Sequence, residues 1–513
     1  MPTSPEPRLL LVLGDQLSHR YITETLEAMP GTDTVLMVES ADFVRRQPYH
    51  AKKIVLVWSA MRHFAAELRS AGFTVEYIRQ EENRAFAETV VETARARNAN
   101  TVAFVRPREA KTRRALLALL TDAELIAAES PDPFWYTAPD AFAGWLQKRT
   151  VPKMEDYYRD VRKKNGILMR GSLPEGGEWN FDKLNRKPFG KKHTPVMPFR
   201  AEPDAVTREA MDTVRAMTET FGLYGSVDDF ASPVCRADAE AALVFFTLNL
   251  LKDFGAYEDA MTTRDDYGFH SLLSIAMNLS LISPQECIAA AINAYESGAV
   301  PLNSVEGFVR QIIGWREFMY HMGETFPGDY QTTNTLSHTH PLPTWYWTGD
   351  TKMRCMRHVI RRVLENAYSH HIERLMVVGN FALLYGANPH ELNRWFWSLY
   401  LDAYEWVVTP NVVGMSQFAD GGWVATKPYV SSGAYINRMS DYCGECAYDP
   451  KESVGETACP FTTLYWAFLI EHETDPLSRR MTQNLWGLEK KTATEREGIT
   501  ARKTILLQMV EDL

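Results

Sequence analysis

Three cysteines near the C-terminus lie close together, and their spacing suits metal chemistry. Cys443, Cys446 and Cys459 fall in the stretch DYCGECAYDPKESVGETACPF, and Cys355 can supply a fourth thiol. A [4Fe–4S] cluster is held by four thiolates, whereas structural zinc is held by paired cysteine knuckles or by cysteine with histidine. One close pair followed by a single cysteine before a proline favours the cluster, with zinc and a chance grouping as the alternatives. The remaining cysteines are expected to be buried small side chains: Cys235 and Cys287.

Two adjacent histidines form the second candidate group. His370 and His371 stand in YSHHIERLM, with Arg374 one helical turn further on and Asp402 later in LYLDAYEW. A histidine pair followed by an arginine indicates proton handling or phosphate binding, with a purely structural role as the alternative. Arg374 and Asp402 would form an ion pair between helices, either beside a charged cofactor or without further function. The Gly-rich segment 411–422, NVVGMSQFADGG, is typical of loops that approach ligands closely.

These groups need elements to position them, and the N-terminal part of the chain alternates strand and helix patterns. The segments with strand character are short and apolar: 8–14, 32–40, 52–58, 73–79, 100–107 and 123–130. With the helical patterns between them, they predict a five-stranded parallel, Rossmann-like sheet. Ligands of such sheets bind beyond the carboxyl ends of the strands, where polar residues occur, with helix capping as the alternative role: Gly14, Asp15, Gln16 and Glu39. No Gly-rich dinucleotide or P-loop motif follows a strand.

Residues 133–205 are expected to form a connector that packs on the surface and carries a basic strip. The cationic residues of the strip are Lys163, Lys164, Lys183, Arg186, Lys187, Lys191, Lys192 and His193. Aromatic side chains are interleaved with them and favour contact with nucleic acid, because aromatics stack on bases while cations hold phosphates: Tyr157, Tyr158, Trp179 and Phe181. Solvated linker charge is the alternative. The predicted organisation is an α/β domain over 1–132, the connector, and a helical domain over 206–513.

Length and composition limit the function classes. The chain has 513 residues, six cysteines and a net charge of −10, so it is neither a disulfide scaffold nor a strongly basic protein. The N-terminus lacks the basic region of a signal peptide, and no apolar run approaches the length of a membrane span. We therefore expect a cytoplasmic protein, most simply a monomer, without a membrane partner.

Taken in order, the motifs resemble the photolyase/cryptochrome family, above all its bacterial iron–sulfur branch of prokaryotic (6-4) photolyases and cryptochrome-like proteins. The matching segments extend over nearly the whole chain: LVLGDQL, WNFDKLNR, YGFHSLLSIAMNLSLISPQEC, GWREF, SHHIER, GMSQFADGG and the four-cysteine set. Each segment is weak alone, and the ordered set is specific. The resemblance implies an N-terminal antenna-chromophore domain and a large all-α FAD-binding domain.

The resemblance also implies three cofactors. FAD would lie in the helical domain, and its expected contacts are Tyr267, His270, Ser271, Leu272, Leu273, Ser274, Arg316, Arg374, Asn380, Asp402 and Asn411. A [4Fe–4S] cluster would be held by residues matching the family's ligands: Cys355, Cys443, Cys446 and Cys459. The antenna 6,7-dimethyl-8-ribityllumazine would contact residues of the sheet domain: Gly14, Asp15, Gln16 and Glu39.

The implied activity is light-driven repair of (6-4) photoproducts in UV-damaged DNA, double- or single-stranded. The lesion must be flipped out of the duplex to reach the cofactor, and transfer of a group between its bases benefits from an acid. His371, beside His370, is the candidate acid. In eukaryotic relatives a further histidine follows four residues later, where this chain has Leu375, so a one-histidine mechanism is expected. The lesion side is expected to include Asp182, Arg186, Met415 and Tyr429.

Other functions remain open at this point. An electron relay through Trp395, Trp347 and Tyr435, also implied by the resemblance, would serve a repair enzyme and a light sensor equally. A cryptochrome-type photoreceptor is therefore the main alternative. A cyclobutane-dimer photolyase is disfavoured by the histidine pair. An iron–sulfur nucleic-acid-binding module like the primase large subunit is disfavoured by the FAD and antenna motifs.

Overall fold

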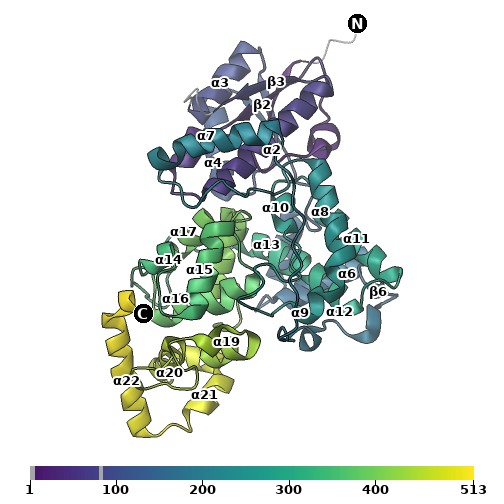
Figure 1. Ribbon diagram of the computed structural model, residues 1–513. Coiled ribbons are helices and arrows are strands. Elements are labelled where there is room, and N and C mark those ends of the chain that lie inside the picture. Colours follow the sequence, from purple (N-terminus) through teal and green to yellow (C-terminus); the bar gives the residue numbers. More distant parts are fainter. Residues whose placement is uncertain (1–5, 80–84) are drawn as a thin grey trace.

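The N-terminal part of the chain is a five-stranded parallel sheet with helices on both faces (Figure 1). The computed structural model describes residues 6–79 and 85–513. In spatial order the strands are β3 (Thr74–Ile78), β2 (Thr34–Val38), β1 (Arg8–Leu11), β4 (Thr101–Val105) and β5 (Ile126–Ser130). Leu9 of β1 pairs with Thr34 on one side and Val102 on the other. The predicted Rossmann-like sheet is confirmed, and the strand order reverses next to β1, where ligands of such sheets bind.

The prediction of a strand at 52–58 is wrong, because this segment is the first half of the helix α2 (Ala51–Ser70). The ring of His50 caps this helix by accepting a hydrogen bond from the backbone N–H of Lys52 at 3.2 Å. The helix α2 lies between the sheet and α7 (Ala205–Phe221), so side chains on most of its faces are buried. A helix buried on most sides lacks a polar face, and a short apolar run of it cannot be distinguished from a strand by periodicity.

The other helices of this domain cover the opposite face of the sheet. They are α3 (Phe86–Ala96) and α4 (Ala110–Asp122), which pack on Leu9, Leu11 and Leu36. A short helix, α1 (Ala41–Arg45), follows β2, and its cap is Ser40, whose hydroxyl accepts from the N–H of Phe43. At the end of β2, helix capping, the alternative role for the polar residues there, is therefore performed by Ser40.

The connector contains more regular structure than its sequence predicts. It includes α5 (Pro139–Gln147), α6 (Met154–Asn165) and a small hairpin of β6 (Met169–Arg170) and β7 (Leu173–Pro174). The helix α6 packs against the helical domain, and Tyr157 and Tyr158 are fully buried. Their hydroxyls donate to Glu317 at 2.8 Å and Glu306 at 2.9 Å. The prediction that these two tyrosines contact nucleic acid is therefore wrong, because they anchor α6 in the protein interior.

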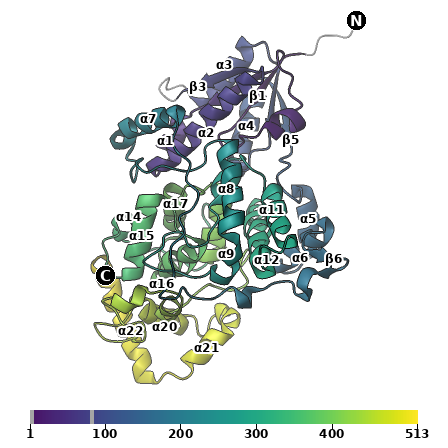
Figure 2. The same cartoon turned by 45° about the vertical axis from the view of Figure 1, so that its right-hand side comes forward.

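The remainder of the chain is helical, as predicted, and the two domains share one continuous hydrophobic core. The helices are α7, α8 (Arg236–Asn249), α9 (Leu251–Tyr257), α10 (Leu273–Asn278), α11 (Pro284–Glu296), α12 (Leu302–Arg310), α13 (Met319–Glu324), α14 (Trp345–Thr348), α15 (Arg354–Asn366), α16 (Asn380–Tyr385), α17 (Pro389–Leu399), α18 (Glu405–Thr409), α19 (Gly433–Met439), α20 (Pro460–Glu471), α21 (Thr482–Leu488) and α22 (Ala493–Gln508). The last three lie at the end of the molecule opposite the sheet (Figures 1 and 2). None of the described helices has the length and apolar character needed to cross a membrane.

The predicted domain boundary near residue 205 falls at the start of α7. This helix packs on α2 of the sheet domain, on the side away from β2. The boundaries at 132 and 205 stay predictions, since the shared core joins the parts.

Candidate functional site

A cavity opens in the helical domain, and three π-helical segments form much of its wall. They are η5 (Gln311–Phe318), η6 (Glu373–Gly379) and η7 (Pro410–Ser416). The cavity encloses about 1350 Å³, including the part open to solvent. Such π-helical turns widen the hydrogen-bond ladder and are frequent at functional sites. The residues of the sequence prediction that line the cavity are His270, Ser271, Leu272, Ser274, Arg316, His370, His371, Arg374, Asp402, Asn411 and Met415.

The ion pair between Arg374 and Asp402 is formed, and it is bidentate. Nη1 and Nη2 of Arg374 donate to the two carboxylate oxygens of Asp402 at 3.0 and 3.2 Å. The hydroxyl of Ser274 donates to the same carboxylate at 2.8 Å. Burial alone would raise the pKa of Asp402, but the Arg374 guanidinium holds it below its ordinary value. A charged, fixed pair therefore forms one wall of the cavity.

Arg316 presents unpaired donors to the same cavity. Its guanidinium contacts the rings of both Trp135 and Trp406, 4.6 and 5.1 Å from their centroids. Its Nη1 and Nη2 are buried without a hydrogen-bond partner among the described residues. Burial, together with repulsion by Arg108, lowers the pKa of Arg316 to about 10. Because uncompensated buried charge is costly, this arrangement fits an anionic ligand such as the diphosphate of FAD.

The histidines His270, His370 and His371 meet at the cavity wall. One ring nitrogen of each lies within 4.8 Å of the others. The rings of His270 and His370 are stacked 4.7 Å apart and 12° from parallel, so their in-plane lone pairs run side by side and do not converge on one metal ion. Burial, aided by repulsion from the neighbouring imidazoles, lowers the pKa of both rings, which are therefore neutral near pH 7.

His371 differs from its neighbours because its side chain is 39% exposed. Its Nε2 lies 3.8 Å from a carboxylate oxygen of Asp259. Leu375, four residues after His371, stands where eukaryotic relatives have a second histidine, and it also lines the cavity. His371 is thus a histidine in this wall that both reaches solvent and faces a carboxylate.

Three residues predicted to contact FAD do not line this cavity: Tyr267, Leu273 and Asn380. Tyr267 and Leu273 line a neighbouring hollow that also includes Ser271 and Leu272. The amide of Asn380 is occupied elsewhere, because it donates to the carbonyl of Ser431 at 2.9 Å and accepts from its N–H at 3.1 Å. Contacts of these three with a cofactor stay predictions.

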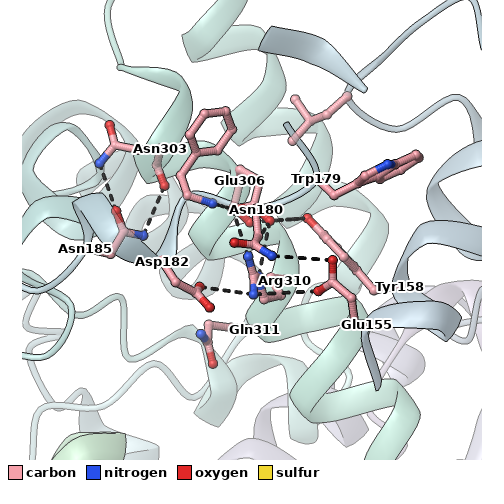
Figure 3. A network of polar contacts seen from close by, with 12 residues as sticks. Glu155, Tyr158, Trp179, Asn180, Asp182, Asn185, Asn303, Glu306, Arg310 and Gln311 are labelled. Atoms are coloured by element: carbon pink, nitrogen blue, oxygen red, sulfur yellow. Dashed lines mark hydrogen bonds and ion pairs between the residues drawn. The ribbon is translucent and has the colours of Figure 1, made fainter. Parts of the chain in front are cut away.

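The predicted lesion residues lie on several elements near the connector. Asp182 is paired with Arg310 of α12 at 3.0 Å, within a network that also holds Glu306 and Glu155 (Figure 3). Asp182 contributes to the raised pKa of Tyr429, after burial, so the two side chains are neighbours. Arg186 is exposed. The guanidinium of Arg438 lies 5.3 Å from the centroid of the Tyr435 ring, and burial, followed by the charge of Asp259, raises the pKa of Tyr435.

Gln311 and Glu258 are site residues that the sequence reasoning missed. Gln311 lines the cavity, and Glu258 lies behind it and accepts its amide hydrogen bond at 2.5 Å. Both residues lie in ordinary helical sequence, and nothing in their spacing marks them. Burial raises the pKa of Glu258 to about 7.

Aromatic rings lead away from the cavity through Tyr400 and Trp395. Tyr400 lines the cavity, and the fully buried Trp395 lies 5.8 Å from it, centroid to centroid. Tyr346 follows at 5.6 Å, and Trp347, the next residue, is half-buried and stacks on Tyr224 at 5.1 Å. Rings in near contact suit electron hopping, and packing explains them equally. The relay stays a prediction.

The four predicted cysteine ligands face one small, enclosed cavity. Cys355 lies on α15, Cys443 in a short turn at η8 (Tyr442–Glu445), and Cys459 caps α20. Burial and the neighbouring thiols raise the pKa of Cys355, and those of Cys443 and Cys459 to about 12 and about 11. Because these thiols do not ionise readily by themselves, they fit a site in which a metal supplies the charge that compensates the thiolates.

The spacing of these sulfurs argues against a single zinc ion. No three of them lie within 4.8 Å of one another, whereas ligands at 2.3 Å in a tetrahedron are about 3.8 Å apart. The wider ring of thiols fits a larger inorganic core. Cys235 and Cys287 lie elsewhere: Cys287 is buried, as expected, whereas Cys235 is only half-buried.

The predicted antenna residues lie at the carboxyl ends of β1 and β2. Glu39 is buried and accepts hydrogen bonds from Arg62 and from the hydroxyl of Tyr77, both at 2.7 Å. Gln16 donates to the carbonyl of Val105 at 3.0 Å. Burial raises the pKa of Asp15 to about 6. A side chain at Gly14 would meet Val57 at 3.0 Å, so the backbone approaches α2 closely there.

The basic strip is exposed on the connector. Lys183, Arg186 and Lys187 are solvent-exposed, as are the lysines at 163, 164, 191 and 192. His193 is the exception, because it is held by Asp265 at 2.7 Å. Trp179 is half-buried beneath cations, with Lys163 5.2 Å from its ring, and Phe181 is half-buried too. The cationic surface is therefore available to phosphates, while most of the interleaved aromatics are not.

Comparisons with known proteins agree with this architecture. A family model described as "Deoxyribodipyrimidine photo-lyase-related protein" matches residues 10–231. A protein of Agrobacterium fabrum named "(6-4) photolyase" is 43% identical over 478 residues, which cover 91% of this chain and 92% of that protein. The fold is similar to a bacterial class III photolyase from Agrobacterium tumefaciens (TM-score 0.57, 15% identity, 86% of this chain and 87% of that one). It is also similar to the Synechocystis cryptochrome (TM-score 0.61, 15% identity, 98% and 95%).

Proposed function

This chain belongs to the photolyase/cryptochrome family, and from this premise we propose that it is a light-driven lyase that repairs (6-4) pyrimidine–pyrimidone photoproducts in DNA. His371 carries the proposal. Its half-exposed ring lines the same cavity as the Arg374–Asp402 pair and faces the carboxylate of Asp259. A repair reaction that moves a group between bases needs an acid at this place.

The cavity would hold FAD, which the family implies. Arg316 would hold its diphosphate, since its two unpaired nitrogens lie in the wall, and the Arg374–Asp402 pair would lie beside the flavin ring. When bound, FAD supplies the light-driven electron transfer to the lesion. The residues of this chain exclude water from the cofactor and fix its orientation.

His371 would hold a proton and donate it to the group that leaves one base of the lesion. The carboxylate of Asp259, 3.8 Å from its Nε2, would orient the ring. His270 and His370 are buried and neutral, so they shape the wall and are not proton donors. With Leu375 in the neighbouring position, one histidine carries out this step.

DNA would bind along the connector. Its exposed lysines and Arg186 neutralise backbone phosphates, and the flipped lesion enters the cavity beside Met415, Asp182 and Tyr429. The net charge of −10 makes this local strip the attractive surface. We propose that the enzyme acts as a monomer in the cytoplasm.

Two further groups complete the proposal. The thiolates of Cys355, Cys443, Cys446 and Cys459 would hold a [4Fe–4S] cluster, which supplies a rigid cross-link between α15, η8 and α20. The residues at the strand ends, Gly14, Asp15, Gln16 and Glu39, would hold the antenna 6,7-dimethyl-8-ribityllumazine. An electron relay would run through Trp395 and Trp347, with Tyr435 as a further member.

A photoreceptor of the cryptochrome type is the second candidate function. The aromatic rings from Tyr400 through Trp395 to Tyr346 are compatible with it, because such a chain would serve light-driven signalling without any substrate. The same rings serve a repair enzyme as well, so a direct assay separates the two functions.

The deciding experiment is anaerobic repair under blue light. One oligonucleotide carries a (6-4) photoproduct, a second carries a cyclobutane dimer, and a sample kept in the dark is the control. We expect light-dependent restoration of the (6-4) strand alone. We expect His371→Ala to abolish restoration while it retains bound flavin. If neither strand is restored by flavin-loaded protein, the photoreceptor replaces the enzyme as the proposed function.

A further inference from the structure

Glu258 is a buried carboxyl group behind the cavity wall, and it is held between two amides. It follows α9 directly and is 7% exposed. The amide nitrogen of Asn185 donates to one carboxylate oxygen at 3.1 Å, and that of Gln311 donates to the other at 2.5 Å. Glu258 lies 73 residues from Asn185 and 53 residues from Gln311 in the chain, so it joins the connector and η5 at one point.

The surrounding backbone leaves room for this contact. A methyl group in place of the hydrogen at Gly307 of α12 would lie 2.9 Å from the Asn185 nitrogen and 3.0 Å from the Glu258 oxygen. Asn185 is fixed on its other side, because its amide oxygen accepts from Asn303 of α12 at 3.0 Å (Figure 3). The Asn185–Glu258–Gln311 chain is therefore built into the packing of the helix and the connector.

The contact decides how Gln311 faces the cavity. Its nitrogen faces Glu258 and donates one N–H to it, so its carbonyl oxygen lies on the opposite side of the amide, and we place this oxygen toward the cavity that Gln311 lines. A flipped pyrimidine is read through the hydrogen-bonding edge of its base, and in the 5′ thymine of a (6-4) product that edge carries one ring N–H donor. An amide oxygen accepts from this donor, whereas an amide nitrogen in its place would repel it.

We propose that Glu258 is a positioning residue that fixes the amide of Gln311 with its oxygen toward the lesion, so that the cavity accepts a hydrogen bond from a pyrimidine ring N–H. The proposal rests on the proposed function and assigns a recognition role to a residue outside the cavity wall. Glu258 acts through Gln311 and does not touch the base itself.

The protonation state of Glu258 controls this contact. Both of its partners donate, so the ionised carboxylate accepts both hydrogen bonds, while the neutral acid places a proton against one of them. Burial raises its pKa to about 7 and Asp259 adds to this, while His371 and Arg310 oppose it. These are the charged groups that face Glu258 from α12 and from the segments beside it. Recognition of the lesion therefore strengthens as the pH rises through about 7.

The test is lesion binding in the dark, which needs no photochemistry. The dissociation constants of the flavin-loaded protein are measured at pH 6 and pH 8 for an oligonucleotide with a (6-4) photoproduct and for the undamaged strand. We expect the preference for the lesion to be about tenfold greater at pH 8, the effect of one hydrogen bond. Glu258→Gln, which resembles the neutral acid, should keep the weaker preference at both pH values.

A second variant separates positioning from folding. Gln311→Ala should lower the preference to the same level and remove its pH dependence, and the double variant with Glu258→Gln should be no weaker than Gln311→Ala alone. Glu296→Gln, an exposed glutamate of α11, is the matched control and should behave as the wild type. Melting temperatures check that each variant folds.

If Glu258→Gln or Gln311→Ala retains the wild-type preference and its pH dependence, the inference is overturned, while light-driven repair by the wild type would leave the proposed function intact. If the double variant is weaker than Gln311→Ala, Glu258 acts by another route and the inference is again overturned. If the wild type has no preference for the lesion at either pH, the inference about Glu258 and the proposed repair function are both contradicted.

Discussion

At the scale of single residues, Arg316 is a buried side chain that lacks its full set of hydrogen-bond partners among the described residues. Nη1 and Nη2 of its guanidinium are unpaired among the described residues, and burial, followed by repulsion from a second buried arginine, Arg108, lowers its pKa. The GWREF motif draws attention to Arg316, but its local sequence does not reveal the missing partner. An unpaired buried cation lowers the stability of the empty protein and increases the affinity for an anion.

Replacement of Arg316 by alanine tests this point. Charge-assisted hydrogen bonds contribute about 1.5–3 kcal/mol, so we expect FAD to bind roughly 10- to 100-fold more weakly, measured by the fluorescence of flavin added to the flavin-free protein. The flavin-free variant should melt no lower than the wild type, because a costly buried charge is removed. Arg361→Ala, with a side chain 55% exposed, is the control. Unchanged FAD affinity in Arg316→Ala would contradict the assignment.

At the scale of elements, short irregular turns carry the chemistry. The π-helical segments η5, η6 and η7 contribute Arg316, Arg374 and Met415 to the cavity. The cysteines lie at the start of α15, in the turn η8 and at the N-terminus of α20, and α20 packs on α22. A metal core among them would therefore hold together helices that are far apart in the chain.

Cys446→Ala is expected to lose most of its iron and to weaken the C-terminal helices. Since the free energy of metal binding is also folding free energy, the melting temperature should fall by several degrees, and proteolysis should cut first in the segment around α20–α22. Elemental analysis for iron and zinc after anaerobic purification makes the measurement. Cys235→Ser, at a half-buried cysteine away from the site, is the control. A full complement of iron in Cys446→Ala would refute the ligand set.

At the scale of the whole molecule, the start of α2 fixes the sheet domain on the helical domain. The Nε2 of His50 donates to the carbonyl of Leu364 at 2.9 Å, and the Nζ of Lys52 donates to the backbone carbonyl of Glu365 at 2.7 Å. The ammonium of Lys53 reaches the carbonyl of Trp397 at 2.7 Å, and burial lowers its pKa to about 7. The His50 ring packs directly against the backbone of Gly225, where a methyl group would lie 2.1 Å from the His50 Nε2. Docking therefore depends on a neutral, buried His50.

This docking predicts a loss of stability in mild acid. Burial lowers the pKa of His50 from 6.5 to about 4. Below pH 6.5 the unfolded chain binds a proton that the folded protein does not, so the free energy of unfolding falls until about pH 4, by roughly 3 kcal/mol for this group. Denaturant unfolding from pH 7 to 4 measures the effect.

His50→Gln should reduce this pH dependence, because the amide can still donate to Leu364 and does not titrate in this range. His19→Gln, at a histidine with an exposed side chain, is the control and should retain the wild-type slope. A slope in His50→Gln equal to that of the wild type would show that His50 does not contribute.

Much of the fold and part of the site could be predicted from the sequence. The alternation of strands and helices, the helical second half, the four cysteines facing one cavity and the Arg374–Asp402 pair all depend on local periodicity or on residue types that rarely occur without a role. The segment 52–58 was wrongly predicted as a strand because α2 is buried on most sides and has no polar face that would show helical periodicity.

Only the tertiary structure decided which groups are paired, exposed or neutral. Tyr157 and Tyr158 can be buried because Glu317 and Glu306, which are distant in the sequence, accept hydrogen bonds from their hydroxyls. Glu258 and Gln311 matter because the fold brings Asn185 beside them. Nη1 and Nη2 of Arg316 have no hydrogen-bond partner among the described residues, since the nearby carboxylates of Asp132 and Glu317 are hydrogen-bonded to other groups. Such properties arise from contacts between distant segments, and desolvation depends on everything packed around a group. The sequence by itself determined which residues can act, and packing determined in which charge state and toward what they act.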